Sequence, residues 1–360
     1  MRHRFHAICP YFAMFPETFV RKYLVWSKPG DIVFDPFSGR GTTAFESILN
    51  GRLAAGCDVN PVAVCVSNAK TDPPSNAAAL NRLDEIESQP YAYDYGLQSS
   101  RFFSACFHPE TLQQILHLRR SLDWEKRRDD RFIAALALGC LHGESHRSKR
   151  YFSNRMPRTI STKPDYSVRW WKLNGYSPPL RNVYNILREQ IQYRFVSDPA
   201  PLRAHIAHGN ARKASHLFPK LKKRVSLIIT SPPYLDTTNF REDQWLRIWF
   251  LGGPHRPTAV PGGDDRHSNV EAYWKFLEEA WRGTSSLVRT GSHMVVRMGG
   301  KRLSRESALD GLWGSLERGF SSRVQLIEQR TTEILRGQRR AFSPNAEGTK
   351  VEHDFHFILP

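Results

Sequence analysis

The sequence predicts an α/β protein with a doubly wound, mostly parallel seven-stranded sheet, interrupted by a helical insertion. Residues 31–49 run from an apolar strand through a glycine-rich turn into a helix, and a second strand follows over residues 53–57. Apolar runs return at residues 227–230 and 292–298, with helical patterns around them. Strands that alternate with helices form parallel sheets covered on both faces.

The composition favours a polyanionic partner. The 360 residues carry a formal net charge of +17, which attracts nucleic acid or an acidic membrane surface. The longest apolar run, residues 132–141, is too short to span a bilayer, and the N-terminal residues lack the sustained apolar segment of a signal peptide. We therefore expect an intracellular protein that binds nucleic acid and no membrane.

The five cysteines are scattered and form no CxxC pair. This spacing predicts neither a disulfide framework nor a zinc site. No metal is expected, and the thiols should be reduced and mostly buried. They are Cys9, Cys57, Cys65, Cys106 and Cys140.

Residues 9–17 are rich in aromatic side chains and punctuated by prolines, and they lead into a predicted helix at residues 18–26. Phe19, Tyr23 and Trp26 recur on one face of that helix. Such a lead-in can contact a ligand or simply dock on the core, and the pattern leaves both interpretations open.

The first strand ends in a glycine-rich turn, at the position where doubly wound sheets bind nucleotides. Gly39 and Gly41 let the backbone approach a ligand that side chains would exclude. The second strand ends at Asp58, close to the spacing at which an acid accepts the ribose hydroxyls of an adenosine. Asp35 precedes the turn, and its carboxylate suits a cationic ligand better than a pyrophosphate. Strand, turn, helix and terminal acid together predict ligand binding.

The predicted insertion, residues 71–199, lies between the second and third strands of the sheet. Amphipathic helices are expected at Leu80–Ile86, Pro109–Leu122, residues 129–141 and residues 179–195.

Between Arg147 and Lys172 the insertion carries eight Lys or Arg residues against one acid, Asp165. The interleaved aromatic residues are Tyr151, Phe152, Tyr166, Trp170 and Trp171. A charge run is commonly a solvated face, but one mixed with aromatics and prolines fits a loop that follows a phosphate backbone and stacks on bases. We predict nucleic-acid contact here.

The strand at residues 227–230 stops abruptly at Ser231-Pro232-Pro233-Tyr234. Two prolines fix φ and donate no backbone hydrogen bond, so nearby carbonyl oxygens stay free to accept. A hydroxyl, a carbonyl and a ring held together can grip a planar heterocycle that carries an exocyclic amine. An ordinary strand end would have the same residues, so the stretch alone leaves two interpretations.

The C-terminal part supplies the remaining elements. We expect a lid or groove at residues 235–269, helices at 271–288 and 309–318, a buried strand at 292–298, and a closing antiparallel pair at 324–334 and 355–359. Residues 1–70 and 200–360 then form one domain around the insertion.

Two motifs give a specific family resemblance. Asp35-Pro36-Phe37-Ser38-Gly39-Arg40-Gly41 resembles the S-adenosylmethionine loop of amino-methylating DNA methyltransferases, and Ser231-Pro232-Pro233-Tyr234 resembles their catalytic motif. Residues 11–15 are similar to the segment that closes over the methionine part of the cofactor, with Met14 where a basic residue is common. Residues 208–211 resemble the adenine-side motif, with Asn210 where an aspartate is more usual.

The resemblance implies an S-adenosylmethionine-binding catalytic domain of methyltransferase fold and an insertion that contacts DNA or recognises the target. The implied catalytic residues are Ser231, Pro232, Pro233 and Tyr234. The implied cofactor-binding residues are Tyr11, Ala13, Phe15, Asp35, Phe37, Gly39, Gly41, Thr42, Asp58, Asn60 and Asn210. The candidate DNA-binding residues are Arg147, Lys149, Arg150, Arg155, Arg158, Lys163, Arg169 and Trp170.

The implied activity is methyl transfer from S-adenosylmethionine to an exocyclic base amine of double-stranded DNA, with the base flipped out of the helix. Serine as the first motif residue is more frequent in the cytosine-N4 members, which favours N4-methylcytosine over N6-methyladenine. The chain has no Pro-Cys dipeptide, which argues against methylation at cytosine carbon 5.

Two alternatives stay open. An RNA base methyltransferase would act on transcripts and not on duplex DNA. A nucleic-acid-binding relative that has lost catalysis is disfavoured by the intact glycine turn and Ser231–Tyr234 motif. The resemblance also allows a companion restriction endonuclease as a partner, while the recognition site and the oligomeric state are not given by the sequence.

Overall fold

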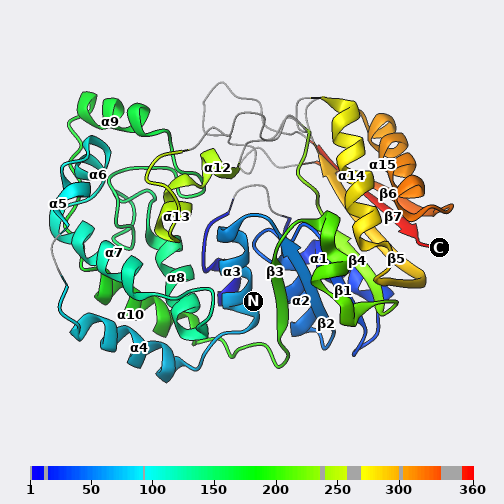
Figure 1. The fold of residues 1–360 in the computed structure, drawn as a ribbon, viewed down its shortest axis with the longest axis horizontal. Coiled ribbons are helices and arrows are strands. Elements are labelled where there is room, and N and C mark those ends of the chain that lie inside the picture. Colours follow the sequence, from blue (N-terminus) through cyan, green and yellow to red (C-terminus); the bar gives the residue numbers. More distant parts are fainter. Residues whose placement is uncertain are drawn as a thin grey trace. The chain divides into compact units, whose positions relative to one another are not determined.

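The computed structural model describes residues 2–11, 15–91, 94–235, 240–257, 269–299, 303–333 and 351–360. The chain divides into two compact units, drawn as a ribbon in Figure 1. The sheet unit comprises residues 15–59, 200–238 and 260–360, and the helical unit comprises residues 1–14, 60–199 and 239–259.

The sheet unit contains one seven-stranded sheet in the order β3-β2-β1-β4-β5-β7-β6. The strands are β1 Ile32–Asp35, β2 Leu53–Asp58, β3 Ala204–His208, β4 Val225–Thr230, β5 Val288–Gly299, β6 Gln325–Glu333 and β7 Val351–Ile358. Strands β1 to β5 pair in parallel, whereas β7 is antiparallel to both β5 and β6. The predicted doubly wound, mostly parallel sheet with its closing antiparallel pair is therefore confirmed.

Helices cover both faces of the sheet. They are α1 Glu17–Tyr23, α2 Thr42–Leu49, α11 Ala214–Leu217, α14 Val270–Ser285 and α15 Arg305–Phe320, with 3-10 turns η2 Leu24–Trp26, η3 Ala211–Lys213 and η4 Pro219–Leu221. The predicted helices at residues 18–26, 44–49, 271–288 and 309–318 correspond to α1 with η2, α2, α14 and α15.

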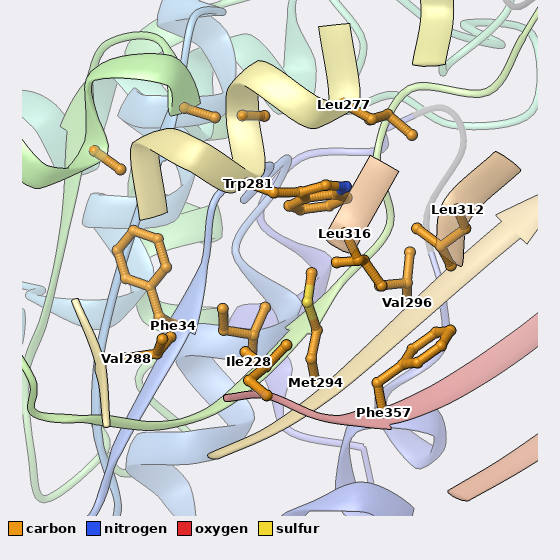
Figure 2. Packing of buried hydrophobic residues seen from close by; sticks show 14 of the residues in the cluster. Phe34, Ile228, Leu277, Trp281, Val288, Met294, Val296, Leu312, Leu316 and Phe357 are labelled. Atoms are coloured by element: carbon orange, nitrogen blue, oxygen red, sulfur yellow. The ribbon is translucent and has the colours of Figure 1, made fainter. Parts of the chain in front are cut away.

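Each central strand contributes to two hydrophobic cores, because successive side chains of a strand point to opposite faces. Val33 and Ile229 pack with Phe19 of α1 on one face. Phe34, Ile228, Met294 and Val296 pack on the other, with Trp281 of α14 and Leu316 of α15 (Figure 2). Full burial of one such side chain contributes about 1.5–3 kcal/mol, so these cores fix the strands whose ends carry the motifs.

The helical unit is built from short helices around aromatic residues. Its helices are η1 Arg4–Ala7, α3 Pro61–Thr71, α4 Asn76–Ser88, α5 Tyr95–Gln98, α6 Arg101–Cys106, α7 Pro109–Ser121, α8 Arg128–Cys140, α9 Pro164–Leu173, α10 Val183–Arg194, α12 Phe240–Asp243 and α13 Trp245–Phe250. Trp245 packs 4.9 Å from Phe102, and Trp249 packs 4.6 Å from Phe103, measured between ring centroids. Both tryptophans belong to the core, although the segment that holds them was expected to form a lid or groove. Residues 236–239 and 258–268 of that segment lie outside the described residues.

Arg247 explains why the helical unit extends beyond residues 71–199. Its guanidinium is fully buried and donates to the carbonyls of Leu138 at 3.0 Å, Pro10 at 2.9 Å and Arg158 at 2.7 Å. A buried charge that loses its partners costs about 3–5 kcal/mol. These bonds therefore join the N-terminal segment and α13 to the insertion.

The cysteines are all buried and free, as predicted. Burial raises the pKa of Cys140 to about 12, so this thiol stays protonated near neutral pH and is a poor nucleophile. Among the described residues, no helix is both long enough and apolar enough to cross a bilayer.

Candidate active site

Motifs far apart in the sequence line up along one edge of the sheet. Strands β3, β2, β1 and β4 are parallel neighbours, so the residues at their carboxyl ends lie on the same edge. In spatial order these are Asn210, Asp58, the 35–41 turn and the Ser231–Tyr234 motif. The chain order reverses between β1 and β4, and open α/β sheets bind ligands at such a reversal.

The turn after β1 has the backbone that its glycines allow. Gly39 and Gly41 have φ of +49° and +67°, in the left-handed region that favours glycine. Gly56 of β2 was not predicted to matter, but a Cβ there would lie 2.2 Å from Ser38 Oγ and 2.4 Å from the Asp35 carbonyl oxygen. The turn is therefore packed directly against β2.

Hydrogen bonds hold this turn to the strands on either side of β1. On the β2 side, Gly39 N donates to Asp58 Oδ2 at 2.8 Å. On the β4 side, Thr230 Oγ1 donates to Asp35 Oδ1 at 2.6 Å. Thr230 is the residue immediately before Ser231, so the glycine turn and the Ser-Pro-Pro-Tyr motif are joined through one short bond.

Asp35 carries the distinctive electrostatics of the turn. Its side chain is fully buried, and Phe37 N also donates to Oδ1, at 3.1 Å. Its Oδ2 has no hydrogen-bond partner among the described residues. Burial raises the pKa of the Asp35 carboxyl to about 7, although the bonds from Thr230 and Phe37 oppose this. A positive charge beside the turn would stabilise the ionised carboxylate, so these residues fit a cationic ligand such as a sulfonium.

The Ser231–Tyr234 motif is held in a hydrogen-bonded arrangement. Ser231 Oγ donates to Tyr234 Oη at 3.3 Å, and Tyr234 Oη donates to Glu352 Oε1 of β7 at 3.0 Å. Ser231 and Tyr234 are half-buried, Pro232 is buried and Pro233 is exposed. Burial and the charge of Glu352 hold the pKa of Tyr234 well above its ordinary value, so the phenol stays protonated and can donate.

Glu352 is itself held by Arg297 of β5, and sequence reasoning missed both residues. Arg297 Nη1 donates to Glu352 Oε2 at 3.0 Å, and its Nε and Nη2 donate to Asp354 at 2.7 and 3.0 Å. Its guanidinium lies 4.0 Å from the ring centroid of Phe19. An arginine inside the otherwise apolar run 294–298 is a usable signal for such a buried ion pair.

Residues 3–68 match a family model described as DNA methylase. An orphan methyltransferase, M.BamHII of Bacillus amyloliquefaciens, is 41% identical over 59 residues, which cover 16% of this chain and 22% of that relative. The likeness to the N6/N4 DNA methylase family is therefore carried by residues 3–68, and the chain spans about a fifth of the length of that curated relative. The methyl donor of this family is S-adenosylmethionine. The residues matched by the family model include the glycine turn and Asp58 but end before the Ser231–Tyr234 motif.

Solved structures give weak overall likeness. TrmN from Thermus thermophilus has a TM-score of 0.39 at 10% identity, covering 99% of this chain and 52% of that one. A SAM-dependent methyltransferase from Methanosarcina mazei also scores 0.39, at 8% identity, covering 97% and 99%. The fold assignment therefore depends on the strand order of this chain itself.

The other predicted cofactor residues are divided between the units. Asn60 caps α3 and donates to Tyr11 Oη at 2.8 Å within the helical unit. In the sheet unit, Phe15 packs 4.9 Å from Phe19, Phe37 packs 5.7 Å from Phe276, buried Thr42 begins α2, and Asn210 Oδ1 accepts from Arg212 N at 3.0 Å. Ala13 lies outside the described residues.

The basic aromatic segment at residues 147–172 differs from its predicted form. Residues 164–173 form helix α9 and not a loop, because Pro164 occupies the first turn and the buried residues Ser167, Val168 and Trp171 follow at helical spacing. Tyr151, Phe152 and Trp171 are buried, so they are unavailable for stacking, whereas Tyr166 and Trp170 are exposed.

The predicted basic residues of this segment fall into two groups. The exposed ones are Arg147, Lys149, Arg158, Lys163 and Arg169. Arg147 forms an ion pair with Glu144 at 3.1 Å, and Lys163 forms one with Glu242 at 3.4 Å. Arg150 and Arg155 are half-buried and lie over the rings of Tyr151 and Tyr176.

Proposed function

We propose that this protein is a DNA methyltransferase that moves a methyl group from S-adenosylmethionine to an exocyclic base amine, with cytosine N4 as the favoured target. The bond from Thr230 to Asp35 is the observation that carries this proposal. It holds a turn suited to a cationic, adenosine-containing ligand next to a motif suited to a planar base with an amine.

S-adenosylmethionine would supply a methyl group activated by its sulfonium. In this proposal the buried carboxylate of Asp35 provides the negative charge near that cation, and Asp58 accepts the ribose hydroxyls. The glycine turn permits close approach of the cofactor. The remaining contacts come from Tyr11, Ala13, Phe15, Phe37, Thr42, Asn60 and Asn210.

The base amine needs orientation and acceptors for its protons. Its lone pair is delocalised into the ring, so the site must align the nitrogen with the methyl group and stabilise the nitrogen as it becomes tetrahedral. The Ser231 hydroxyl and the Pro232 carbonyl would accept the amine hydrogens, and Tyr234 would stack on the base. A base inside a duplex cannot reach these groups, so the reaction requires flipping.

Double-stranded DNA would be held by residues 71–199, with residues 1–70 and 200–360 as the catalytic domain. The exposed cations of residues 147–169 and the net charge of +17 support this assignment. A methyltransferase of this kind works in the cytoplasm on chromosomal DNA, alone or beside a companion restriction endonuclease.

Adenine N6 is the second candidate target. Serine at position 231 favours cytosine N4, because aspartate is more frequent at that place in the adenine members. Direct identification of the product base separates the two targets.

Mass spectrometry of nucleosides tests the function. Purified protein and S-adenosylmethionine are incubated with unmethylated duplex DNA or with RNA, with Ser231→Ala as the matched control. We expect N4-methylcytosine from the duplex, and much less from the variant. N6-methyladenine would change the target base, whereas modified RNA alone, or no modified base, would overturn the proposal.

A further inference from the structure

The Ser231–Tyr234 motif continues into a hydrogen-bond chain that ends at an ion pair. The proton donors run in one direction, from Ser231 Oγ to Tyr234 Oη at 3.3 Å and from Tyr234 Oη to Glu352 Oε1 at 3.0 Å. Arg297 Nη1 donates to the other oxygen of Glu352 at 3.0 Å. All four residues belong to the sheet unit.

The chemistry of the end groups sets this direction. An ionised carboxylate can only accept, and a guanidinium can only donate. Glu352 therefore requires Tyr234 to donate, which leaves the phenol oxygen to accept the proton of Ser231. Once the single proton of Ser231 is committed to Tyr234, the serine oxygen can interact with a further donor only as an acceptor.

We propose that Glu352 is a positioning residue that fixes the direction of this chain and so keeps the Ser231 hydroxyl an acceptor toward the base amine. The inference rests on the proposed function and adds a residue far from the motif in sequence. An amine about to be methylated presents its hydrogens to the site, so a serine that donated instead would oppose the aligned geometry.

The ion pair with Arg297 favours the charged form of Glu352, although the side chain is largely shielded from solvent. Its side chain is 18% exposed, and that of Arg297 is 6% exposed. Burial, and then the charge of Asp354, raise the pKa of Glu352, whereas the Arg297 charge and the Tyr234 hydrogen bond lower it. The net shift is upward. The register neighbour on β6, Thr332, carries no charge. Protonated Glu352 could donate, so the fixed direction is lost as the pH falls through its raised pKa.

Glu352→Gln should reverse the direction of the Ser231–Tyr234–Glu352 hydrogen bonds while leaving the shape of the side chain at position 352 almost unchanged. A glutamine has one amide oxygen, and Arg297 must take it because Arg297 has only donors. The amide NH2 then faces Tyr234 and forces the phenol to accept. Tyr234 donates to Ser231 instead, and the serine proton points toward the base amine.

The test compares single-turnover methylation of duplex DNA by the parent protein, Glu352→Gln, Tyr234→Phe and the double variant. Glu328→Gln, which alters another glutamate ion pair on the neighbouring strand β6, opposite His356 and away from the motif, is the matched control. We expect Glu352→Gln to lower the rate by about 10²-fold with unchanged S-adenosylmethionine affinity and melting temperature. In the Tyr234→Phe background, which removes the relaying hydroxyl, Glu352→Gln should have no further effect.

The pH profile of the parent gives a second readout that does not depend on folding of the variant. With S-adenosylmethionine saturating, so that the bound cation keeps Asp35 ionised, the rate should fall on the acid side with a midpoint above the ordinary glutamate pKa, and Tyr234→Phe should lack this limb. A parental rate for folded Glu352→Gln, an added loss in the Tyr234→Phe background, or no acid limb would each overturn the inference. No methylation by the parent protein would instead overturn the proposed function on which it rests.

Discussion

The carboxyl edge of the sheet and the basic segment at residues 147–172 are both singled out by residue type, but they use their polar and aromatic residues differently. At the sheet edge, motif residues bond to one another, as Asp35 does with Thr230 and Gly39 with Asp58. In the basic segment, Tyr151, Phe152 and Trp171 are buried. Motif residues at the ends of parallel strands correctly predict specific contacts. The aromatic content of the basic segment, by contrast, overestimates how many rings are exposed for nucleic-acid binding.

Adjacent tryptophans on α9 give the largest expected contrast. Trp171 is 1% exposed and donates to the Arg155 carbonyl at 2.6 Å, whereas Trp170 is 37% exposed. Trp171→Ala should lower the free energy of unfolding by about 3–5 kcal/mol. Trp170→Ala should change it by about 0.5 kcal/mol or less but weaken duplex binding.

Denaturant unfolding and fluorescence anisotropy with labelled duplex measure these two effects. Equal stability losses for the two variants would mean that the buried and exposed faces of α9 are wrongly assigned. Unchanged duplex affinity for Trp170→Ala would remove this tryptophan from the proposed DNA surface.

Asp58 tests the cofactor side of the sheet edge. Asp58→Ala should weaken S-adenosylmethionine binding by about 1.5–3 kcal/mol, because it removes hydrogen bonds to a charged acceptor together with the bond to Gly39 N. Calorimetry measures the affinity, with Asp310→Ala on the exposed side of α15 as the control. Equal affinity for the two variants would contradict the assignment of Asp58.

Loss of exposed arginines should have a smaller effect on duplex affinity, measured at any single salt concentration, than the changes above. Replacing Arg158 and Arg169 with alanine should make duplex binding less salt-dependent, by about 0.9 in logarithmic slope for each phosphate that the variant no longer neutralises. The same double change at Lys220 and Lys222, exposed lysines of the sheet unit, should leave the slope unaltered. If both double variants change the salt dependence equally, the positive charge of the protein attracts DNA without a defined binding surface.

The smallest effect that we expect to measure is the release of a proton from Asp35 when the cofactor binds. Burial raises the pKa of Asp35 to about 7, so part of the population is protonated at neutral pH. A cationic cofactor favours the ionised form, and its binding near pH 7 should release up to one proton. Calorimetric enthalpies should then vary with the ionisation enthalpy of the buffer, and Asp35→Asn should abolish that variation.

Asp35 also predicts a pH dependence of stability with a definite sign. Its folded-state pKa lies above its ordinary value near 4, so the folded protein binds the proton more tightly than the unfolded chain. The free energy of unfolding should therefore fall as the pH rises from about 4 to about 7 through this group. Asp35→Asn should flatten this part of the curve, and an unchanged slope would contradict the cause given.

Much of the fold could be predicted because its strands are short, apolar and separated by clear helical periods. The glycine turn and Asp58 could also be predicted, since both follow strands directly in the sequence. Helix α3 and strand β3 were not singled out by the pattern, and α9 was taken for a loop, because its charges and exposed rings hide a single buried face.

The ion pair behind Tyr234 could not be predicted from local sequence. Arg297 and Asp354 lie directly opposite each other across β5 and β7, and this register depends on how two distant strands pair. The closing strand was also expected to begin at residue 355, but β7 begins at Val351. Glu352 and Asp354 were therefore not considered as site residues.

Single-turnover methylation of duplex DNA by Tyr234→Ala tests the central claim most directly, with cofactor affinity and melting temperature measured on the same preparation. Removing the stacking ring should weaken base binding by about 1–3 kcal/mol. The methyl-transfer rate should fall by more than this loss of binding alone implies, while S-adenosylmethionine affinity and melting temperature stay near the parental values. A folded Tyr234→Ala protein that methylates DNA at the parental rate would show that the Ser231–Tyr234 motif is not the active site.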